Sequence, residues 1–263
     1  MEENSITYLS SFFKKVKQYF IEISLFASFC IQFFKQAFRP SFEFKELIKQ
    51  SYLIGYKSFS LVAITGFIMG LVLTIQLRPT LVEFGAESWL PAMVAVSIIR
   101  EIGPVITALI FAGKVGSSIG AELASMKVTE QIDAMEVSGI NPFKYIVVTR
   151  VVAATFMLPL LVILSDAISL YGAFVGVNLK GDVSFALFVL QVFESLSFAD
   201  IFPAFIKTIF FGYFVAIIGC YIGYNASKGT EGVAQAANTS VVFASLSVFI
   251  LDMIAVQLTS LFS

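Results

Sequence analysis

The sequence predicts an all-α integral membrane protein with five transmembrane helices. The chain of 263 residues is 58% apolar and only 13% charged, which lies outside the range of ordinary soluble domains. Five of its runs are nearly free of ionisable residues and reach the length of about 20 residues that spans a bilayer. Because these runs lack the alternation of barrel strands and lipid offers the backbone no hydrogen-bond partners, we expect helices.

The predicted spans divide the chain into two parts. Residues 51–263 form a five-span domain, with spans at about 58–77, 89–112, 151–179, 205–226 and 238–262. In residues 1–50, apolar residues recur at helical spacing from Phe12 to Phe38, but the uncharged part is too short to span. We expect an amphipathic helix lying in the membrane interface there; a soluble helix packed on another subunit is the alternative.

Lys and Arg residues in the loops predict the orientation of the chain. Thirteen of them lie before the first span, between the second and third spans, or between the fourth and fifth spans, whereas only Arg78 and Lys180 lie on the other side. The N-terminus and the loop from Gly113 to Arg150 are therefore expected in the cytoplasm or in the stroma of an organelle. The C-terminus is expected on the opposite side.

Glycine pairs four residues apart indicate close contacts between helix backbones. They occur at Gly66/Gly70, Gly116/Gly120, Gly172/Gly176 and Gly219/Gly223. Three of the four pairs lie within predicted spans. Together they predict tightly packed spans and suggest a dimer.

Composition argues against nucleic-acid binding and catalysis. The chain has 17 Lys and Arg against 18 Asp and Glu, without the basic excess of a nucleic-acid surface. It has no histidine, the commonest general base. Cys30 and Cys220 lie in apolar runs and are interpreted as packing residues, and Gly113-Lys114 lacks the rest of a phosphate-binding loop. We therefore expect no catalytic residue, no metal and no cofactor in this chain, which is predicted not to be an enzyme.

Five ionisable residues inside or at the edge of spans are the candidate functional residues. They are Arg100, Glu101, Asp166, Lys207 and Asp252. Each costs a few kcal/mol in lipid unless it is paired or hydrated. Pairs of Arg100 with Asp166 or Asp252, and of Glu101 with Lys207, are expected. The cluster is either a polar gate beneath a substrate cavity or a static ion-pair network, with a proton relay as a third possibility.

The loop between the second and third spans carries charges around an apolar stripe. The charged residues are Glu122, Lys127, Glu130, Asp133 and Glu136, and the apolar ones are Leu123, Met126, Ile132 and Met135. This pattern predicts a short amphipathic helix that ends before Asn141-Pro142. Such a helix could dock into a groove of a cytoplasmic partner, or could be a solvated surface helix.

The central part of the sequence resembles a known family. The stretches that carry the resemblance are Arg100-Glu101-Ile102-Gly103-Pro104, Phe111-Ala112-Gly113-Lys114-Val115-Gly116-Ser117, Ala121-Glu122, Met126, Thr129-Glu130-Gln131-Ile132-Asp133-Ala134-Met135 and Asn141-Pro142. They resemble the MlaE-type permeases, the membrane subunits of ABC lipid transporters that work with MCE-domain proteins.

The resemblance implies partners. It implies a homodimer, a cytoplasmic ABC ATPase that holds ATP and Mg, an MCE-domain protein on the far side, and phospholipid as the substrate, and it allows a small STAS-type regulator. The membrane would be a bacterial inner membrane, with the inner envelope of a plastid as the alternative.

The resemblance also implies roles for particular residues. The coupling helix that meets the ATPase would include Glu122, Met126, Glu130, Gln131 and Asp133. The outer end of the first span would contact acyl chains through Leu73, Leu77, Leu81 and Phe84, although these residues could equally face ordinary membrane lipid.

The function expected from these observations is that of an ABC-type permease subunit, which moves phospholipid or a similar amphiphile between membranes and is driven by a separate ATPase. The alternative is an ion-coupled secondary transporter that works without an ATPase, with Glu101 or Asp252 titrating.

Overall fold

The computed structural model describes residues 2–40, 43–179 and 181–262, and the side chains of these residues except those of 2–16, 19 and 262. Within these ranges the chain forms helices, turns and irregular segments, and no strand. The predicted all-α class is confirmed.

Five helical rods are long and apolar enough to cross a membrane. The first, fourth and fifth are α2 (Phe44–Glu83), α9 (Phe198–Tyr224) and α10 (Thr230–Phe262). The second is an unbroken series of η1 (Glu87–Trp89), α3 (Leu90–Ser97), η2 (Ile98–Ile102), α4 (Gly103–Phe111), η3 (Ala112–Gly116) and α5 (Ser117–Val128), and the third joins η4 (Phe143–Val148) to α7 (Thr149–Asn178). Outside the rods lie α1 (Glu2–Ala37), α6 (Gln131–Val137) and α8 (Phe185–Ser195).

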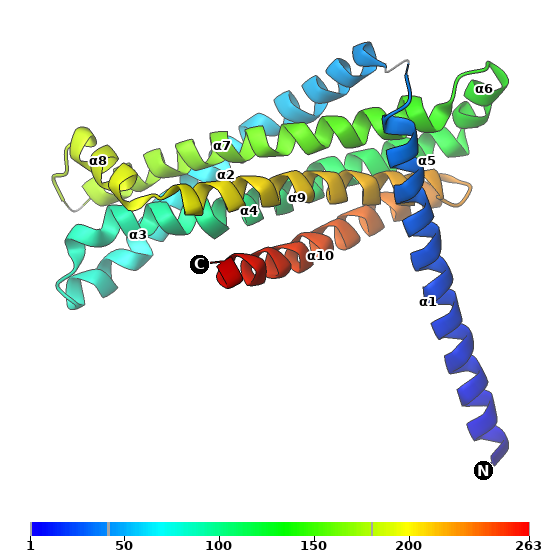
Figure 1. Cartoon of the computed structure of the whole chain (residues 1–263), viewed down its shortest axis with the longest axis horizontal. Helices are drawn as coiled ribbons and strands as arrows, with labels where there is room; N and C mark the ends of the chain where they lie inside the picture. Colours follow the sequence, from blue (N-terminus) through cyan, green and yellow to red (C-terminus); the bar gives the residue numbers. More distant parts are fainter. Residues whose placement is uncertain (1, 41–42, 180, 263) are drawn as a thin grey trace.

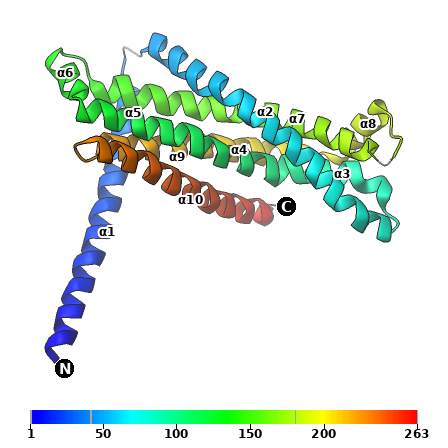
Figure 2. The same cartoon turned by 180° about the vertical axis from the view of Figure 1, so that it is seen from behind.

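The rods lie side by side in an elongated bundle (Figure 1). One end carries α6 and the start of α10, and the other carries α3 and α8. We call these the α6 end and the α8 end. The view from behind shows the same arrangement, with α1 leaving the α6 end at a steep angle to the rods (Figure 2).

The rods match the predicted spans in number and order, but they extend beyond them. The first begins at Phe44 rather than at residue 58, and the second continues to Val128 rather than stopping at 112. The span boundaries were predicted from runs without charged residues. A helix can continue beyond the hydrocarbon core wherever water or side chains form hydrogen bonds with the free backbone groups at its ends. The boundary drawn between residues 50 and 51 consequently falls inside α2.

The helix α8 lies outside the predicted spans. Its 11 residues are apolar but too few to cross a bilayer. The Ser184 hydroxyl caps its start by accepting the N–H of Leu187 at 3.3 Å. Phe188 and Val192 bury one face of α8 in a hydrophobic cluster shared with α3 and α7. A search of the sequence for span-length runs overlooks α8 because the helix is too short. In the structure it covers the α8 end of the bundle.

Small residues hold α2 and α7 against each other. A methyl group added at Gly70 would collide with the backbone carbonyl of Ser169, and one added at Gly172 would collide with the carbonyl of Phe67. Further along the same contact, Gly66 faces Ser165. The close packing that the glycine pairs predict is therefore present between these two rods.

Aromatic side chains fix the C-terminal part of α1 to the bundle. Phe29 is buried and makes edge-to-face contacts with Phe143, Tyr221 and Tyr224, with ring centroids 4.8, 5.4 and 6.2 Å apart. Such pairs stabilise a contact beyond the area they bury. On the part of α1 that projects away from the bundle, Phe20 is exposed.

We predict that Gly70→Ala destabilises the bundle by about 1–3 kcal/mol, because the added methyl group meets rigid backbone. The measurement is the apparent melting temperature of the detergent-solubilised protein. The control is Gly113→Ala, because a methyl group there would meet no atom within 4 Å. Equal melting temperatures for the two variants would contradict this account of the contact between α2 and α7.

Candidate functional site

A buried lysine joins three rods inside the bundle. Lys207 of α9 is 6% exposed, and its ammonium donates to Glu101 Oε2 of η2 at 2.7 Å and to Asp252 Oδ1 of α10 at 2.9 Å. We call these three residues the lysine triad. The predicted pair of Glu101 with Lys207 is present. Asp252, expected as a partner of Arg100, is bound to Lys207 instead.

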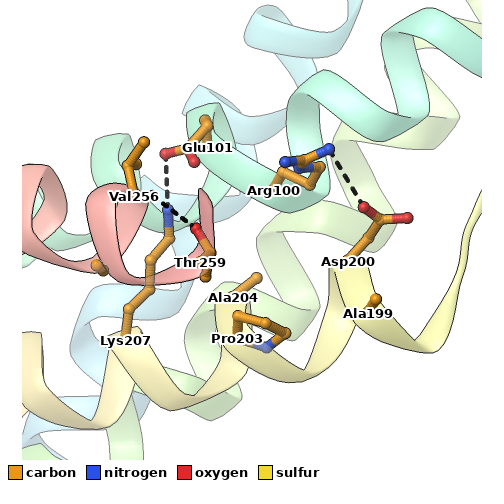
Figure 3. A pocket seen from close by; sticks show the side chains of 10 residues that line it. Arg100, Glu101, Ala199, Asp200, Pro203, Ala204, Lys207, Val256 and Thr259 are labelled. Carbon is orange, nitrogen blue, oxygen red and sulfur yellow. Dashed lines mark hydrogen bonds and ion pairs between the residues drawn. The ribbon is translucent and has the colours of Figure 1, made fainter. Parts of the chain in front are cut away.

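Arg100 points away from the lysine triad. Its guanidinium lies 3.4 Å from the carboxylate of Asp200 in the first turn of α9, and Figure 3 shows the two side chains facing each other. The expected pairs of Arg100 with Asp166 or Asp252 are therefore wrong. Consecutive residues of a helix diverge by about 100°, so Arg100 and Glu101 reach different partners.

The sequence analysis missed Asp200, although a local signal marks it. The Asp200 carboxylate accepts the Ser197 N–H at 3.0 Å and the Ser197 hydroxyl at 2.7 Å, which completes a capping box at the start of α9. A serine followed three residues later by an acid ahead of an apolar run predicts such a helix start. This signal could have placed the start of the predicted fourth span at residue 198 rather than 205.

A pocket opens beside these charges. Its empty volume is about 330 Å³, and its walls come from η2, α9 and α10. The polar lining consists of Arg100, Glu101, Asp200, Lys207 and Thr259. Figure 3 shows Glu101 and Lys207 pointing toward each other on one side of the pocket, and Arg100 and Asp200 on the other. The pocket thus offers both signs of charge to a bound molecule.

The helix that presents Arg100 and Glu101 has an irregular turn at this point. The N–H of Gly103 bonds to the carbonyl of Ile98, five residues back, so η2 is a π turn. Pro104 follows and has no N–H to donate. Turns of this kind often occur at functional sites, and here the π turn carries Arg100 and Glu101, two of the four charged residues that line the pocket.

Asp166 stays outside the ion pairs of this site. Its Oδ1 atom is buried and has no hydrogen-bond partner. It occupies the space where a side chain would stand at Gly103. Of the five residues predicted to form one polar cluster, three form the lysine triad, Arg100 lies at the rim of the pocket, and Asp166 lies apart.

The predicted coupling helix is divided in two. The second rod continues through Glu122 and Met126 to the end of α5, and Glu130 then adopts a left-handed conformation with φ of 58° before α6 begins at Gln131. We call residues 122–137 the elbow. The expectation of a single amphipathic helix is wrong, because the apolar residues of the loop fit two short helices that meet at a turn.

Contacts hold the elbow against the bundle. Ile132 is buried, and Lys127 lies 3.2 Å from Asp133 across the turn. At the base of the elbow, Glu122 Oε1 accepts from the Arg150 guanidinium at 2.7 Å. Because Arg150 is 4% exposed, this ion pair ties the end of the second rod to the start of α7.

The four residues proposed as acyl-chain contacts do not form one exposed surface. Leu81 is buried in a hydrophobic cluster with residues of α3, α7 and α8, and Leu73 and Leu77 pack against that cluster. Phe84 is exposed. Leu73 and Leu77 are only partly buried, so the predicted acyl-chain contact stays a prediction.

The cysteines take part in packing. Cys220 is buried within α9, and Cys30 of α1 is half-buried. Burial raises the pKa of the Cys30 thiol above its ordinary value, which disfavours the reactive thiolate. Among the described residues, no group of three or more His, Cys, Asp or Glu side chains could hold a metal ion.

Comparison with known proteins identifies the family. The family described as permease MlaE matches residues 47–258. The chain belongs to the MlaE permease family. It is 39% identical over 213 residues to the intermembrane phospholipid transport system permease protein MlaE of Haemophilus influenzae, covering 80% of this chain and 81% of that protein. A probable ABC transporter permease protein of Rickettsia typhi is 35% identical over 236 residues, covering 90% and 91% of the two chains.

The match confirms the family that the central residues indicated. The matched range includes all five rods apart from their outermost residues, so this MlaE-family permease is a multi-pass membrane protein. It also includes the lysine triad, the pocket beside it and the elbow.

We predict that Lys207→Met costs this permease about 3–5 kcal/mol, because two acids lose their shared cation inside the bundle. Arg100→Met should cost less than about 1 kcal/mol, because the Arg100 side chain is about half exposed. The measurement is the melting temperature in detergent. Adding Glu101→Gln and Asp252→Asn to Lys207→Met should recover stability. If Lys207→Met and Arg100→Met melt alike, the lysine triad does not hold the rods together.

Proposed function

We propose that this chain is the membrane subunit of an ABC-type transporter that moves phospholipid between membranes. The observation that carries the proposal is the family match across residues 47–258, which covers the five rods apart from their outermost residues. Relatives of the chain include an intermembrane phospholipid transport permease and probable ABC transporter permeases. A bacterial inner membrane is the setting that these relatives favour.

The motor of the transporter is a separate ATPase that docks on the elbow. This chain has no phosphate-binding loop of its own. The elbow stands at the α6 end, and Glu130 and Val137 are exposed there. The excess of Lys and Arg in the loops on this side supports a cytoplasmic position of the α6 end, where ATP is available.

The charged pocket is the polar part of the lipid path. A phospholipid headgroup carries a phosphate, and Arg100 and Lys207 line the same pocket as Glu101 and Asp200. Arg100 is about half exposed and has spare donors for a phosphate oxygen. Glu101 and Lys207 of the lysine triad line this pocket, so separating them would change the space available to a headgroup.

Other partners would complete the transporter. Among the five rods α10 buries the smallest share of its residues, and Phe243, Leu246 and Phe249 are exposed along it. This apolar surface suits lipid or a second copy of the chain. An MCE-domain protein at the α8 end and a small STAS-type regulator on the ATPase remain proposals that rest on family resemblance. The steep angle between α1 and the rods suits a helix lying in the membrane interface.

We predict that Glu130→Lys weakens capture of the ATPase and lowers ATP-driven lipid transfer several-fold, because it reverses a charge at the turn of the elbow. The measurements are ATPase recovered with the tagged permease and lipid transfer between vesicles. Glu194→Lys is the matched control: it makes the same charge change at an exposed position of α8, at the opposite end of the bundle.

Two outcomes would contradict the proposed function. One is that Glu130→Lys leaves both measurements unchanged while the permease is folded. The other is that vesicles holding this chain alone move solute down an ion gradient without nucleotide, which is the behaviour of a secondary transporter.

A further inference from the structure

The carboxyl group of Asp166 is the one side-chain acid of the described rods with a buried, unpartnered oxygen. Its Oδ1 atom is enclosed and makes no hydrogen bond. The missing side chain of Gly103 leaves the space that Oδ1 fills. Gly103 thus leaves room for this oxygen atom, but no hydrogen-bond donor stabilises a negative charge on it.

The charged groups around Asp166 are already engaged. From η2, Arg100 faces Asp200 and Glu101 faces Lys207. From α10, Asp252 also binds Lys207. α2 has no ionisable residue between Lys57 and Arg78.

Lys207 of α9 belongs to the neighbouring lysine triad, because it binds Glu101, two residues before the Gly103 that Asp166 packs against. Its ammonium is shared by two carboxylates, Glu101 and Asp252. An ionised Asp166 would make a third negative charge around one cation inside a membrane bundle. Such a charge costs several kcal/mol, and a proton removes that cost.

We propose that Asp166 is a proton-binding site of the permease, neutral in this conformation, and that it loses its proton to become a counter-ion of Lys207 when Glu101 moves away. The protonation of Asp166 concerns the conformation described here. The exchange of counter-ions around Lys207 rests on the proposed transport function, because it requires a conformational cycle.

The surrounding structure offers the proton a route. A second pocket, with an empty volume of about 240 Å³, lies between α2, the second rod and α7. Gly103 and Ser165 line it beside Asp166, and the hydroxyl-bearing residues Thr65, Thr107 and Ser169 complete its polar lining. This pocket has room for about one water molecule, and a water molecule that reaches the Asp166 carboxyl group would take up its proton and leave a carboxylate behind.

The π turn supplies the movement of Glu101. A shift of one residue in a helical turn rotates a side chain by about 100°, which is enough to take Glu101 off Lys207. Lys207 would then stay paired with Asp252 and form a second ion pair with ionised Asp166. Its ammonium would still bind two carboxylates. The freed Glu101 faces the charged pocket, where it is partly exposed already.

The protonation state is tested by infrared spectroscopy of the full transporter in vesicles, with its aspartates carrying ¹³C in the carboxyl group. We expect a carbonyl band of a protonated aspartic acid at neutral pH, absent from Asp166→Asn and Asp166→Glu and retained in Asp182→Asn, which removes an exposed aspartate far from the lysine triad. The Glu variant keeps an ionisable acid in case Asn fails to assemble. A wild-type spectrum without such a band, or a band that survives in Asp166→Glu, overturns the proposal.

The switch is tested by ATP-driven lipid transfer over a range of pH. Wild-type transfer should fall as pH is lowered, because the proton then stays on Asp166. Asp166→Asn should transfer several-fold less at every pH and show no such fall, whereas Glu22→Gln, at an exposed position of α1, should keep the wild-type profile. If the wild type transfers lipid and Asp166→Asn matches it at every pH, the switch is wrong. If the wild-type transporter moves no lipid, the proposed function fails, and the infrared result still decides the protonation state.

Discussion

The ammonium of Lys207 sets the main constraint on this bundle. A cation inside a membrane protein must find anions, and in the described structure it finds them on two other rods, at Glu101 and Asp252. Lys207 therefore holds η2, α9 and α10 at one level, and the charged pocket forms where they meet. A buried ion pair of this kind adds little net stability but strongly penalises arrangements that break it. Its main effect is to specify which rods face each other.

The rods differ in how firmly they are held. Gly70 and Gly172 bring the backbones of α2 and α7 into contact, which leaves little freedom for movement between them. The second rod is assembled from short helices and two π turns, η2 and η3. It joins Glu101 to Val128 over 27 residues, or about 40 Å at helical rise. One continuous element therefore links the elbow, where an ATPase would act, to the lysine triad.

Sequence patterns predicted the rods and the family but not all of the ion pairs between charged side chains. Apolar runs fix the number of spans because lipid leaves the backbone no other choice. The pair of Glu101 with Lys207 was also predictable, since both residues needed a partner. The choice of Asp200 over Asp166 as the partner of Arg100 was not, because it depends on the π turn at Ile98–Ile102 and on where α9 begins. The break of the elbow at Glu130 likewise depends on one left-handed residue.

The stretch from Arg100 to Pro104 shows why stability and transport are difficult to separate here. Arg100 and Glu101 diverge to different partners, Gly103 leaves room for Asp166, and Pro104 removes a backbone donor next to the π turn. Each feature stabilises the arrangement described, yet each also permits an alternative one: an exposed arginine can exchange its partner, a π turn can shift, and a protonated acid can ionise. A site that must hold a lysine inside the membrane and still let its partners change requires such a combination of firm packing and replaceable counter-ions.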